Sequence, residues 1–403
     1  MNDPIRTGGV QSGLPIKKKK VWLKPLLIVV AILLAVGGFL IFKTGSVLNK
    51  ISSDSNMFGS LVHMIPGVKQ ELAGEEEGRI NILLMGMRGE HVVGGGTLAD
   101  TIMVASINPS ANKVALLSIP RDLYVNNPSK GYKTKINAVY AYGEEDGKKQ
   151  GAEDMKKVVS EIVGMPVEYS LIINFKGFTD LVDAIGGVEV ELKKPFEEVM
   201  QFNEEHVCDS TVFTVPTGKF ETKTKKYLSK ETGLYKTRVV ASYPLCTNAV
   251  TECGGDFKLP AGKQTLSGEK ALCYARARKT SNDFERAKRQ QYVIQQIKNK
   301  ALSMGTLTDF NKVNGIIDSL GNNVSTDLQA WEMKRFYDLQ STMQNPQMLQ
   351  HVLENTDEGL LYTPQSTPET GYILAPIGDN YDKIRQLFKD IFIVASQSDS
   401  EPK

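Results

Sequence analysis

The sequence predicts an α/β fold in which a central mixed sheet is flanked by helices on both faces. Predominantly apolar runs of strand length alternate with segments of helical periodicity. Strands that are apolar along most of their length are typical of a sheet covered on both sides. In chain order, we expect strands at 80–86, 100–107 and 113–119, a helix at 152–163, a strand at 169–173, a helix at 175–185 and a strand at 188–192.

The second half of the chain leaves this pattern and then returns to it. Residues 195–257 are polar and rich in Thr and Lys, so we interpret them as an insertion into the core. A strand over 272–278 and a helix that continues to residue 303 resume the dense apolar pattern. We expect helices within 305–355, one of them at 328–339 behind a cap at Thr326 and Asp327. A short strand and a closing helix are expected over 371–392, and a disordered tail at 393–403.

The N-terminus has the pattern of a membrane anchor. Four lysines, Lys17 to Lys20, precede a run from Pro25 to Phe42 that contains no charged residue, close to the ~20 residues that span a bilayer. We therefore expect one transmembrane helix at 21–43, a cytoplasmic tail at 1–20, a juxtamembrane linker at 44–78 and an extracytoplasmic domain at 79–392. A cleaved signal peptide is the alternative, but no small-residue cleavage site ends the apolar run.

An extracytoplasmic location permits disulfides among the four cysteines. Cys208, Cys246 and Cys253 lie in the insertion, which allows one bridge among the three, and the sequence does not select the pair. Cys273 is expected as a buried free thiol on the core side of its strand. Zinc is disfavoured, because there is no CxxC spacing and His206 stands alone in this segment.

An arginine-rich segment is the strongest functional signal. On the strand expected at 272–278, Arg276 and Arg278 project from the same face as Tyr274. Residues 276–289 contain six cations and two anions. These are Arg276, Arg278, Lys279, Arg286, Lys288 and Arg289 against Asp283 and Glu285.

The following helix carries part of this charge inward. Asn282 or Asp283 offers an N-cap, and Arg286, Arg289 and Gln290 extend backwards the apolar stripe of the helix. Cations that face the core need a counter-ion, and a helix N-terminus also attracts anions. Phosphate or pyrophosphate is therefore the expected ligand. The alternative is an ordinary solvated basic helix.

A glycine-rich segment, residues 86–101, ends at a candidate metal ligand. Its pattern is neither a Walker A loop nor a dinucleotide-binding GxGxxG motif. Asp100 lies at the mouth of a strand, where its carboxylate can hold a hard cation that bridges to phosphate oxygens. The alternative is that Asp100 caps a turn with Thr101.

Two more candidates follow the third strand. Arg121 and Asp122 come directly after an apolar strand and a proline, and strand ends in α/β sheets are where sites gather. A structural ion pair between these two residues is the alternative. Lys135, Asn137 and Tyr140 can line the same pocket, and a surface location explains them equally well.

These segments together resemble the LytR-CpsA-Psr family of cell-envelope phosphotransferases. The resemblance covers residues 79–392 and rests on five blocks in the family's order. The blocks are DTIMV, SIPRD, KINAVY, FTDLVDAIGGVEV and YARARKTSNDFERAKRQQ.

The resemblance implies a membrane-anchored enzyme that moves a glycopolymer from a polyprenyl-pyrophosphate carrier to a peptidoglycan hydroxyl. It implies catalytic roles for Arg121, Arg276, Arg278 and Asp100, and makes Asp100 the ligand of a Mg²⁺ cofactor. The pyrophosphate-binding residues implied by the match and by the candidate pocket are Arg121, Arg276, Arg278, Arg286, Gln290 and Lys135.

One departure from the family pattern affects the metal. The family has GxDxR after the first strand, whereas this chain has Arg88 at the position of the aspartate. A cation cannot replace a metal ligand. Asp100 then acts with water and phosphate oxygens alone, or Glu90 or Asp283 supplies the missing carboxylate, or the loop is shifted by its three consecutive glycines.

Two other functions compete with transfer. The first is a protein that binds a lipid diphosphate or an anionic glycan at the cell envelope without turning it over, an alternative that Arg88 keeps open. The second is nucleic-acid binding through the arginine helix. The expected topology argues against it, because the basic segment lies across the membrane from the DNA, and no helix-turn-helix pattern is present.

Overall fold

A computed structural model gives the structure of the protein. The expected anchor at 21–43 and the tail beyond residue 394 lie outside the residues that it describes. Within the described part, no helix is long and apolar enough to cross a membrane. The structure describes residues 71–89, 96–198, 205–208, 214–229, 232–248, 253, 257–278, 280–303, 315–316, 319–343 and 345–394.

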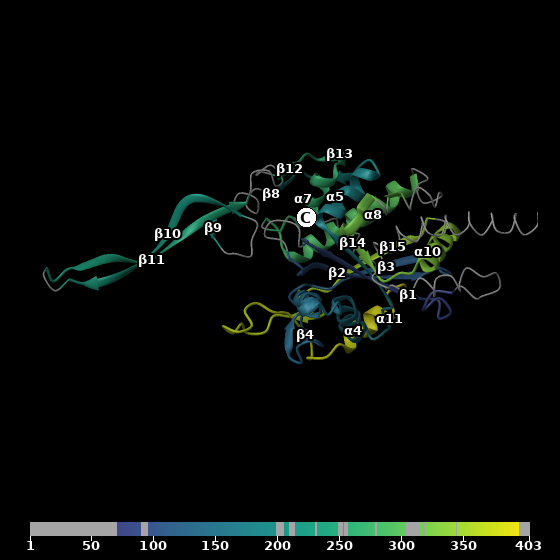
Figure 1. Ribbon diagram of the computed structural model, residues 1–403, viewed down its shortest axis with the longest axis horizontal. Coiled ribbons are helices and arrows are strands. Elements are labelled where there is room, and N and C mark those ends of the chain that lie inside the picture. The colour runs from purple at the N-terminus through teal and green to yellow at the C-terminus, as the bar shows by residue number, and fades with distance from the viewer. Residues whose placement is uncertain are drawn as a thin grey trace, which may run out of the picture. The chain divides into compact units, whose positions relative to one another are not determined.

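A six-stranded mixed sheet forms the centre of the fold, as the sequence predicts (Figure 1). Its first three strands in the chain form an antiparallel meander. β6 runs parallel to β1, β15 runs parallel to β3, and β14 runs antiparallel to β6. In spatial order the strands are β14 (Val324–Thr326), β6 (Tyr169–Asn174), β1 (Ile80–Met87), β2 (Ala99–Asn108), β3 (Lys113–Ser118) and β15 (Gln347–Val352).

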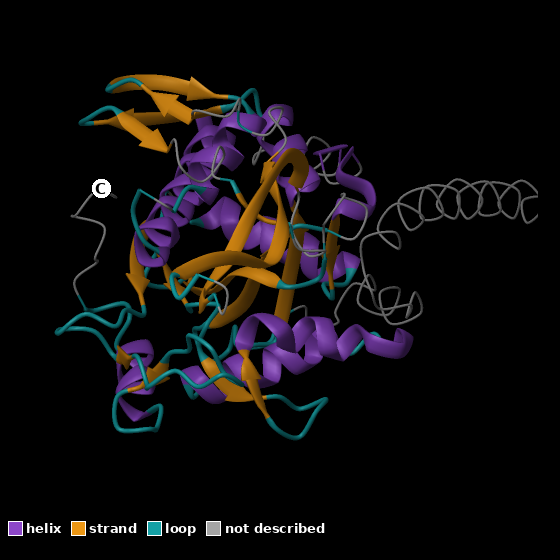
Figure 2. Cartoon of the chain, turned by 90° about the vertical axis from the view of Figure 1, so that its left-hand side faces the viewer, coloured by secondary structure: helices purple, strands orange, loops and turns teal. Residues whose placement is uncertain are grey.

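Helices cover both faces of this sheet, which confirms the predicted arrangement (Figure 2). On one face, α4 (Gly151–Val163) and α11 (Asp382–Lys389) join the largest apolar core, which includes Leu83 of β1. On the other face, Ile82 packs with α10 (Ala330–Thr342), and Ile173 packs with α5 (Phe175–Ala184). Alternate residues of a strand point to opposite faces, so both faces can be apolar.

The helix that carries the arginines, α8 (Asp283–Ser303), is joined to this second face by a buried amide. The Gln291 side chain donates to Ser118 Oγ over 2.7 Å and to the His351 carbonyl over 2.8 Å. Ser118 ends β3 and His351 belongs to β15, so one side chain holds the helix across two parallel strands. The N-terminus of α8 is thereby fixed near the edge of the sheet where β3 ends.

Two small antiparallel pairs and a long hairpin lie in and around the segment predicted as an insertion. β7 (Val188–Leu192) pairs with β13 (Gly262–Leu266), and β8 (Phe196–Glu198) pairs with β12 (Phe257–Leu259). Between β8 and β12, β10 (Thr214–Leu228) and β11 (Tyr235–Asn248) form the hairpin, and β9 (His206–Val207) pairs with β11. The remaining elements are β4 (Tyr124–Asn126), β5 (Lys133–Lys135), α3 (Val139–Glu144), β16 (Leu361–Tyr362) and β17 (Ala375–Pro376).

The strand predicted over 272–278 is wrong, because these residues end a helix, α7 (Gly268–Arg276). Ser267 caps the helix by accepting a hydrogen bond from the Lys270 amide. Ala271, Tyr274 and Ala275 are buried at the i, i+3, i+4 spacing of a helix. A short segment of small residues alternating with polar ones fits either period, so pattern alone could not decide.

The prediction that Cys273 is a free thiol is also wrong. Cys273 forms a disulfide with Cys253, and Cys208 pairs with Cys246. Two bridges are therefore present where the sequence suggested one, and the first of them ties the end of the insertion to α7.

The helical prediction for 305–355 is wrong in part. Residues 324–326 and 347–352 are the strands β14 and β15, which form the two edges of the central sheet. The helix between them begins later than expected and has its cap at Gln329, whose side chain and that of Glu332 form a capping box. The closing short strand and helix appear as β17 and α11.

Protonation of His351 is expected to weaken the fold at acidic pH. His351 is 1% exposed in β15, and burial lowers the pKa of its imidazole against a smaller opposing effect of a hydrogen bond to the Ile391 backbone. The unfolded chain therefore binds a proton at a higher pH than the folded chain, and stability is lost as the pH falls below about 6.5.

We expect the free energy of unfolding to fall from pH 7.5 towards about pH 5.5, with a slope from this group approaching about 1.4 kcal/mol per pH unit. Urea unfolding of the wild type and of His351→Gln over this range measures the effect. The variant should lose that part of the slope. Equal slopes for the two proteins would contradict the assignment.

Candidate active site

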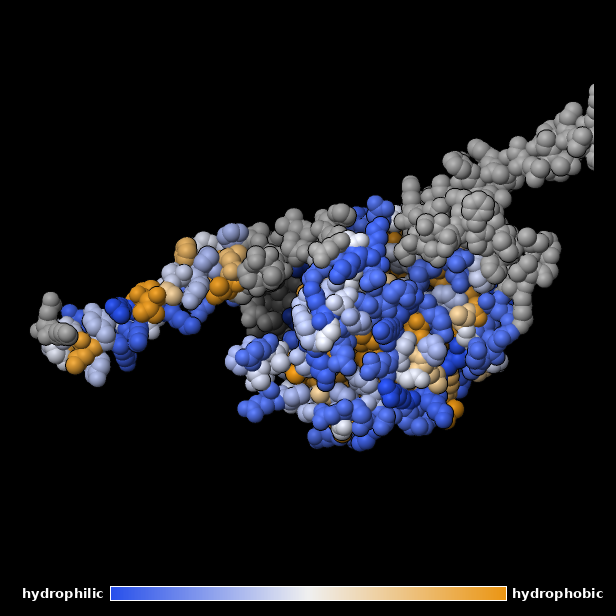
Figure 3. Space-filling model, turned by 60° about the horizontal axis from the view of Figure 1, so that its bottom comes forward, coloured by the Kyte–Doolittle hydropathy of each residue, from blue (hydrophilic) through white to orange (hydrophobic). Residues whose placement is uncertain are grey.

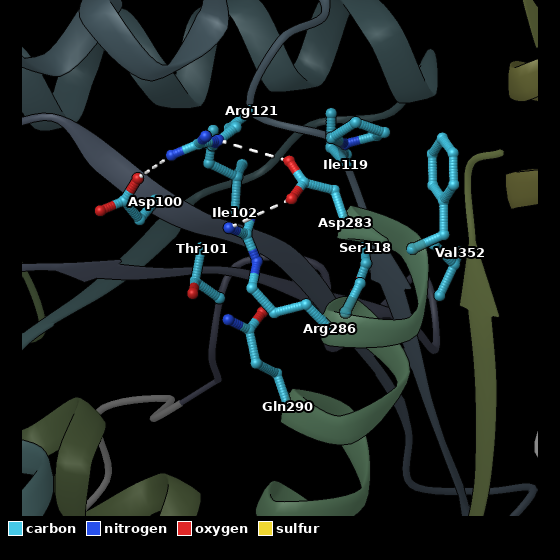
Figure 4. A pocket seen from close by; sticks show the side chains of 13 residues that line it. Asp100, Thr101, Ile102, Ser118, Ile119, Arg121, Asp283, Arg286, Gln290 and Val352 are labelled. Carbon is cyan, nitrogen blue, oxygen red and sulfur yellow. Dashed lines mark hydrogen bonds and ion pairs between the residues drawn. The ribbon is translucent and has the colours of Figure 1, made fainter. Parts of the chain in front are cut away.

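A polar pocket lies at the edge of the central sheet where β3 ends and β2 begins (Figure 4). Because these strands are antiparallel, the start of one meets the end of the other. Asp100 comes from the start of β2, Arg121 from the loop after β3, and Asp283 from the first residue of α8. Arg286 and Gln290 lie one and two turns further along α8 and complete the polar wall.

The Asp283 carboxylate is the centre of this cluster. Its oxygens lie 3.5 Å from Arg121 Nε, 3.6 Å from an Arg278 nitrogen and 3.4 Å from an Arg286 nitrogen. Arg121 also donates to Asp100 over 2.6 Å. Three guanidiniums from three separate chain segments therefore converge on one carboxylate, so the predicted meeting of Arg121 with the later arginines is confirmed.

Asp283 is free for this role because its neighbour caps the helix. The Asn282 side chain accepts a hydrogen bond from the Glu285 amide over 2.9 Å, three residues along, which is the N-cap geometry. The sequence left the cap open between Asn282 and Asp283. The sequence did not predict that three arginines converge on Asp283, although it named Asp283 among the carboxylates that could be metal ligands.

Arg286 is more deeply buried than Arg121 and is less well compensated by carboxylates. Desolvation lowers its pKa to about 10, attraction to Asp283 opposes that effect, and repulsion from Arg121 and Arg278 adds to it. Burial also acts to lower the pKa of Arg121, but the attraction of Asp100, Asp283 and Asp122 outweighs burial and raises it. Both side chains stay charged at neutral pH, and an added anion beside Arg286 would relieve its desolvation and repulsion.

The other predicted residues lie around this centre. The Gln290 amide donates to the Ala275 carbonyl over 3.3 Å and joins α8 to α7. Lys135 pairs with Asp122 over 2.8 Å, and Asp122 lies 3.7 Å from Arg121, so Lys135 reaches the cluster through a carboxylate. Arg276 ends α7 with its guanidinium 4.6 Å from the centre of the Phe175 ring and does not line the pocket.

Arg289 faces the core, as the helical stripe predicts, and is 0% exposed. Its guanidinium donates to the carbonyls of Tyr274 and Ala277 and to Ser281 Oγ. These acceptors span the end of α7 and the connection to α8, which includes Arg278. Arg289 is therefore a positioning residue for the arginine segment.

Asp100 and Asp283 are the two carboxylates among the described residues that line the pocket, so they are the residues there that could hold Mg²⁺. Magnesium is commonly held by one or two carboxylates together with phosphate oxygens and water, rather than by a full protein cage. The described chain contains no group of three or more His, Cys, Asp or Glu side chains suited to a metal. A pair of carboxylates such as Asp100 and Asp283 could hold a metal only together with ligands from a phosphate group and water. Glu90, one alternative for the missing carboxylate, lies outside the described residues.

The same chain segments match one protein family. The sequence model of the LytR_cpsA_psr family matches residues 49–371. The chain belongs to this family.

Relatives of known name within the LytR_cpsA_psr family extend over most of the chain. TagU of Oceanobacillus iheyensis, named a polyisoprenyl-teichoic acid–peptidoglycan teichoic acid transferase, is 30% identical over 318 residues, which cover 77% of this chain and 78% of the relative. TagT of Bacillus subtilis, named for the same transfer, is 26% identical over 92% of this chain and 93% of its own.

Solved structures share the fold. A structure of TagT bound to LIIa-WTA has a TM-score of 0.51 at 22% identity and covers 81% of this chain and 95% of its own. Protein gbs0355 of Streptococcus agalactiae has a TM-score of 0.52 at 22% identity and covers 82% and 93%. At this identity the likeness concerns the fold alone.

Substitution of Arg289 should loosen the α7–α8 connection more than the rest of the protein. In Arg289→Met, two carbonyls and a hydroxyl lose their donor in a buried place, which costs roughly 1–3 kcal/mol for each group left unsatisfied. We expect faster amide hydrogen exchange at residues 274–281, measured by mass spectrometry.

The matched control is Ile384→Ala, a buried change in α11 on the opposite face of the sheet that costs about 2–5 kcal/mol. That variant should speed exchange throughout the core without a preference for residues 274–281. The positioning role fails if both variants give the same exchange pattern.

Proposed function

We propose that this protein transfers a phosphate-linked glycopolymer from a polyprenyl-pyrophosphate carrier to a hydroxyl of peptidoglycan. The observation that carries the proposal is the convergence of Arg121, Arg278 and Arg286 on Asp283, which lines a polar pocket together with Arg121 and Arg286. The transferase names of relatives that match most of the chain support the same reaction.

In the proposed reaction, the acceptor oxygen bonds to the glycan-side phosphorus and the bond from that phosphorus to the bridging oxygen breaks. Polyprenyl phosphate leaves with the electron pair of that bond, and the proton of the acceptor hydroxyl passes to the leaving phosphate or to water. Phosphoryl transfer of this kind depends mainly on positioning and on stabilisation of charge, so no covalent nucleophile is required from the protein. Arginines suit this role because their planar donors bind two phosphate oxygens at once.

Within this scheme, each side chain has a separate task. Arg286 binds the diphosphate from the buried side, where its charge is less well compensated than that of Arg121. Arg121 and Arg278 bind it from the two sides of Asp283, which holds the three guanidiniums together before the substrate arrives. Such preorganisation limits the conformational entropy lost at the moment of reaction.

The proposal includes a Mg²⁺ ion at Asp100, whose carboxylate shares Arg121 with Asp283. When bound with the diphosphate, Mg²⁺ supplies neutralisation of the charge that develops on phosphate oxygens. Asp100 is suited to this because its side chain is 37% exposed and only one of its oxygens contacts Arg121. Arg88 lies just past β1 and leaves Asp100 without the first aspartate of the family pattern.

The proposal also includes an extracytoplasmic location. The lysine block at 17–20 and the uncharged run at 25–42 support a single anchor with the pocket-bearing part of the chain outside the cell.

Protease added to intact cells should then digest that part of the chain. Protection of that part until the cells are lysed would contradict the extracytoplasmic location.

The role of the arginine cluster is tested by Arg278→Ala in the full-length protein. Removing one of several charge-stabilising donors should reduce transfer by about 10²–10³-fold, because Arg278 touches the proposed diphosphate position. The assay is polyprenyl phosphate release from a lipid-diphosphate glycan with Mg²⁺ and peptidoglycan.

Arg385→Ala, an arginine on α11 that bonds the Glu161 carbonyl, is the matched control and should keep its activity. Near-normal release by Arg278→Ala would rule out this site. The other outcome is a wild type that binds the lipid diphosphate saturably and releases no polyprenyl phosphate under any condition. That result would favour the alternative function, a protein that binds its ligand without turning it over.

A further inference from the structure

The hairpin β10–β11 gathers four cations on one face and most of its apolar side chains on the other, where Lys226 is the one cation among the described pairs. Residues paired directly across antiparallel strands project to the same side. One face, which we call the basic face, carries the paired residues Lys225 and Arg238, the paired residues Tyr227 and Lys236, and also Lys223 and Tyr243. The other face carries Phe220, Leu228, Tyr235 and Val239, and Figure 3 shows both kinds of side chain on the hairpin.

The basic face brings four cations together in solvent. Lys225 and Arg238 lie directly opposite each other, and Lys223 and Lys236 follow on the same side at the strand spacing of ~6.7 Å for two residues. Glu221 is the one carboxylate in this array of paired residues. Among the described residues, no carboxylate forms an ion pair with any of the four cations.

Such an arrangement is unfavourable in isolation. Like charges directly opposite in a sheet destabilise the pairing, and a two-stranded ribbon has little packing to offset that cost. The adjacent tyrosines, Tyr227 and Tyr243, are 42% and 40% exposed and add flat surfaces with hydroxyl groups. The basic face is therefore built for an anionic ligand that also offers sugar or polyol surface.

The ends of the insertion are fixed beside the active-site arginines. Glu198, at the end of β8, accepts hydrogen bonds from the Thr280 amide over 3.1 Å and from its hydroxyl. At the other end, Cys253 is bonded to Cys273 in α7. Both attachments are to the α7–α8 segment that presents Arg278.

We propose that the basic face binds the polyphosphodiester chain of the glycopolymer whose diphosphate end occupies the pocket. This inference rests on the proposed transfer. Four cations spread along two strands suit an extended polyanion, because several weak contacts on one chain add up where a single phosphate would bind poorly.

A lipid surface fits this hairpin less well. A segment that lies on an anionic membrane sets its cations at the border of its apolar side, where lipid head groups meet the acyl chains. Here four of the paired cations lie on the face opposite the apolar side chains, and Lys226 alone among the described paired cations shares the apolar face. The polymer is therefore the ligand to which the charge pattern points.

The test compares two full-length variants with equal loss of charge. The first changes the basic face, with Lys223→Gln, Lys225→Gln, Lys236→Gln and Arg238→Gln. The control changes four exposed lysines elsewhere, with Lys226→Gln, Lys263→Gln, Lys270→Gln and Lys383→Gln. Lys226 serves as an internal comparison, because it belongs to the apolar face of the same hairpin.

Both variants are titrated in detergent with poly(glycerol phosphate) that carries no lipid. We expect the basic-face variant to bind at least about tenfold more weakly, and the slope of log affinity against log salt to fall by roughly 3, as for the loss of four phosphate contacts. The control should bind like the wild type.

Three results would overturn the inference. These are equal losses in the two variants, unchanged binding by the basic-face variant, and binding of the wild type to anionic phospholipid vesicles but not to the polymer. Vesicle binding that is lost on changing Phe220, Leu228 and Val239 to Ser would assign the hairpin to the membrane instead.

A second measurement separates this inference from the transfer reaction. With a long-chain lipid-diphosphate polymer, the basic-face variant should raise KM at least about tenfold and leave kcat unchanged. With a lipid-diphosphate disaccharide, both parameters should match the wild type. If no protein transfers either substrate, the proposed function fails while the titration still decides the role of the basic face.

Discussion

The buried guanidinium of Arg289 is the interaction on which the arrangement of the site depends. A charge with no exposure to solvent is costly unless it is fully hydrogen-bonded, and here the partners are two main-chain carbonyls and a hydroxyl. Those acceptors belong to the end of α7 and to the connection that follows it. The hydrogen bonds that stabilise the buried cation therefore also fix the backbone that presents Arg278.

Asp283 solves a second electrostatic problem in the same place. Three neighbouring guanidiniums repel one another, and the lowered pKa of Arg286 reflects burial first and that repulsion second. Asp283 reduces the repulsion among all three, and the cluster is still not neutralised, because among the described residues three carboxylates face three arginines and a lysine. The site thus keeps its shape without substrate and retains attraction for an anion. This balance explains why the first residue of α8 is an acid that does not cap the helix.

Much of the sheet could be predicted, because long apolar strands and helices with a clear period carry their own signal. The strands β1, β2, β3, β6 and β7 all appear where the sequence indicates them. The errors have physical causes. The segment around Tyr274 is short enough to fit either period, and β15 gains its strand conformation from pairing with the distant β3. The partner of Cys273 likewise depends on how the insertion folds back, which no local pattern records.

The site was easier to predict by residue than by geometry. The sequence grouped Arg276, Arg278, Arg286 and Arg289 and added Arg121 as a candidate partner. The structure brings Arg121, Arg278 and Arg286 together, although the secondary structure assumed for Arg278 was wrong. The reason is that the cluster depends on the N-terminus of α8, whose helical stripe was clear, and on the end of β3, whose apolar run was clear. Arg276 shows the limit of this reasoning. Alternation on a strand would place it beside Arg278, whereas the end of a helix turns it towards Phe175.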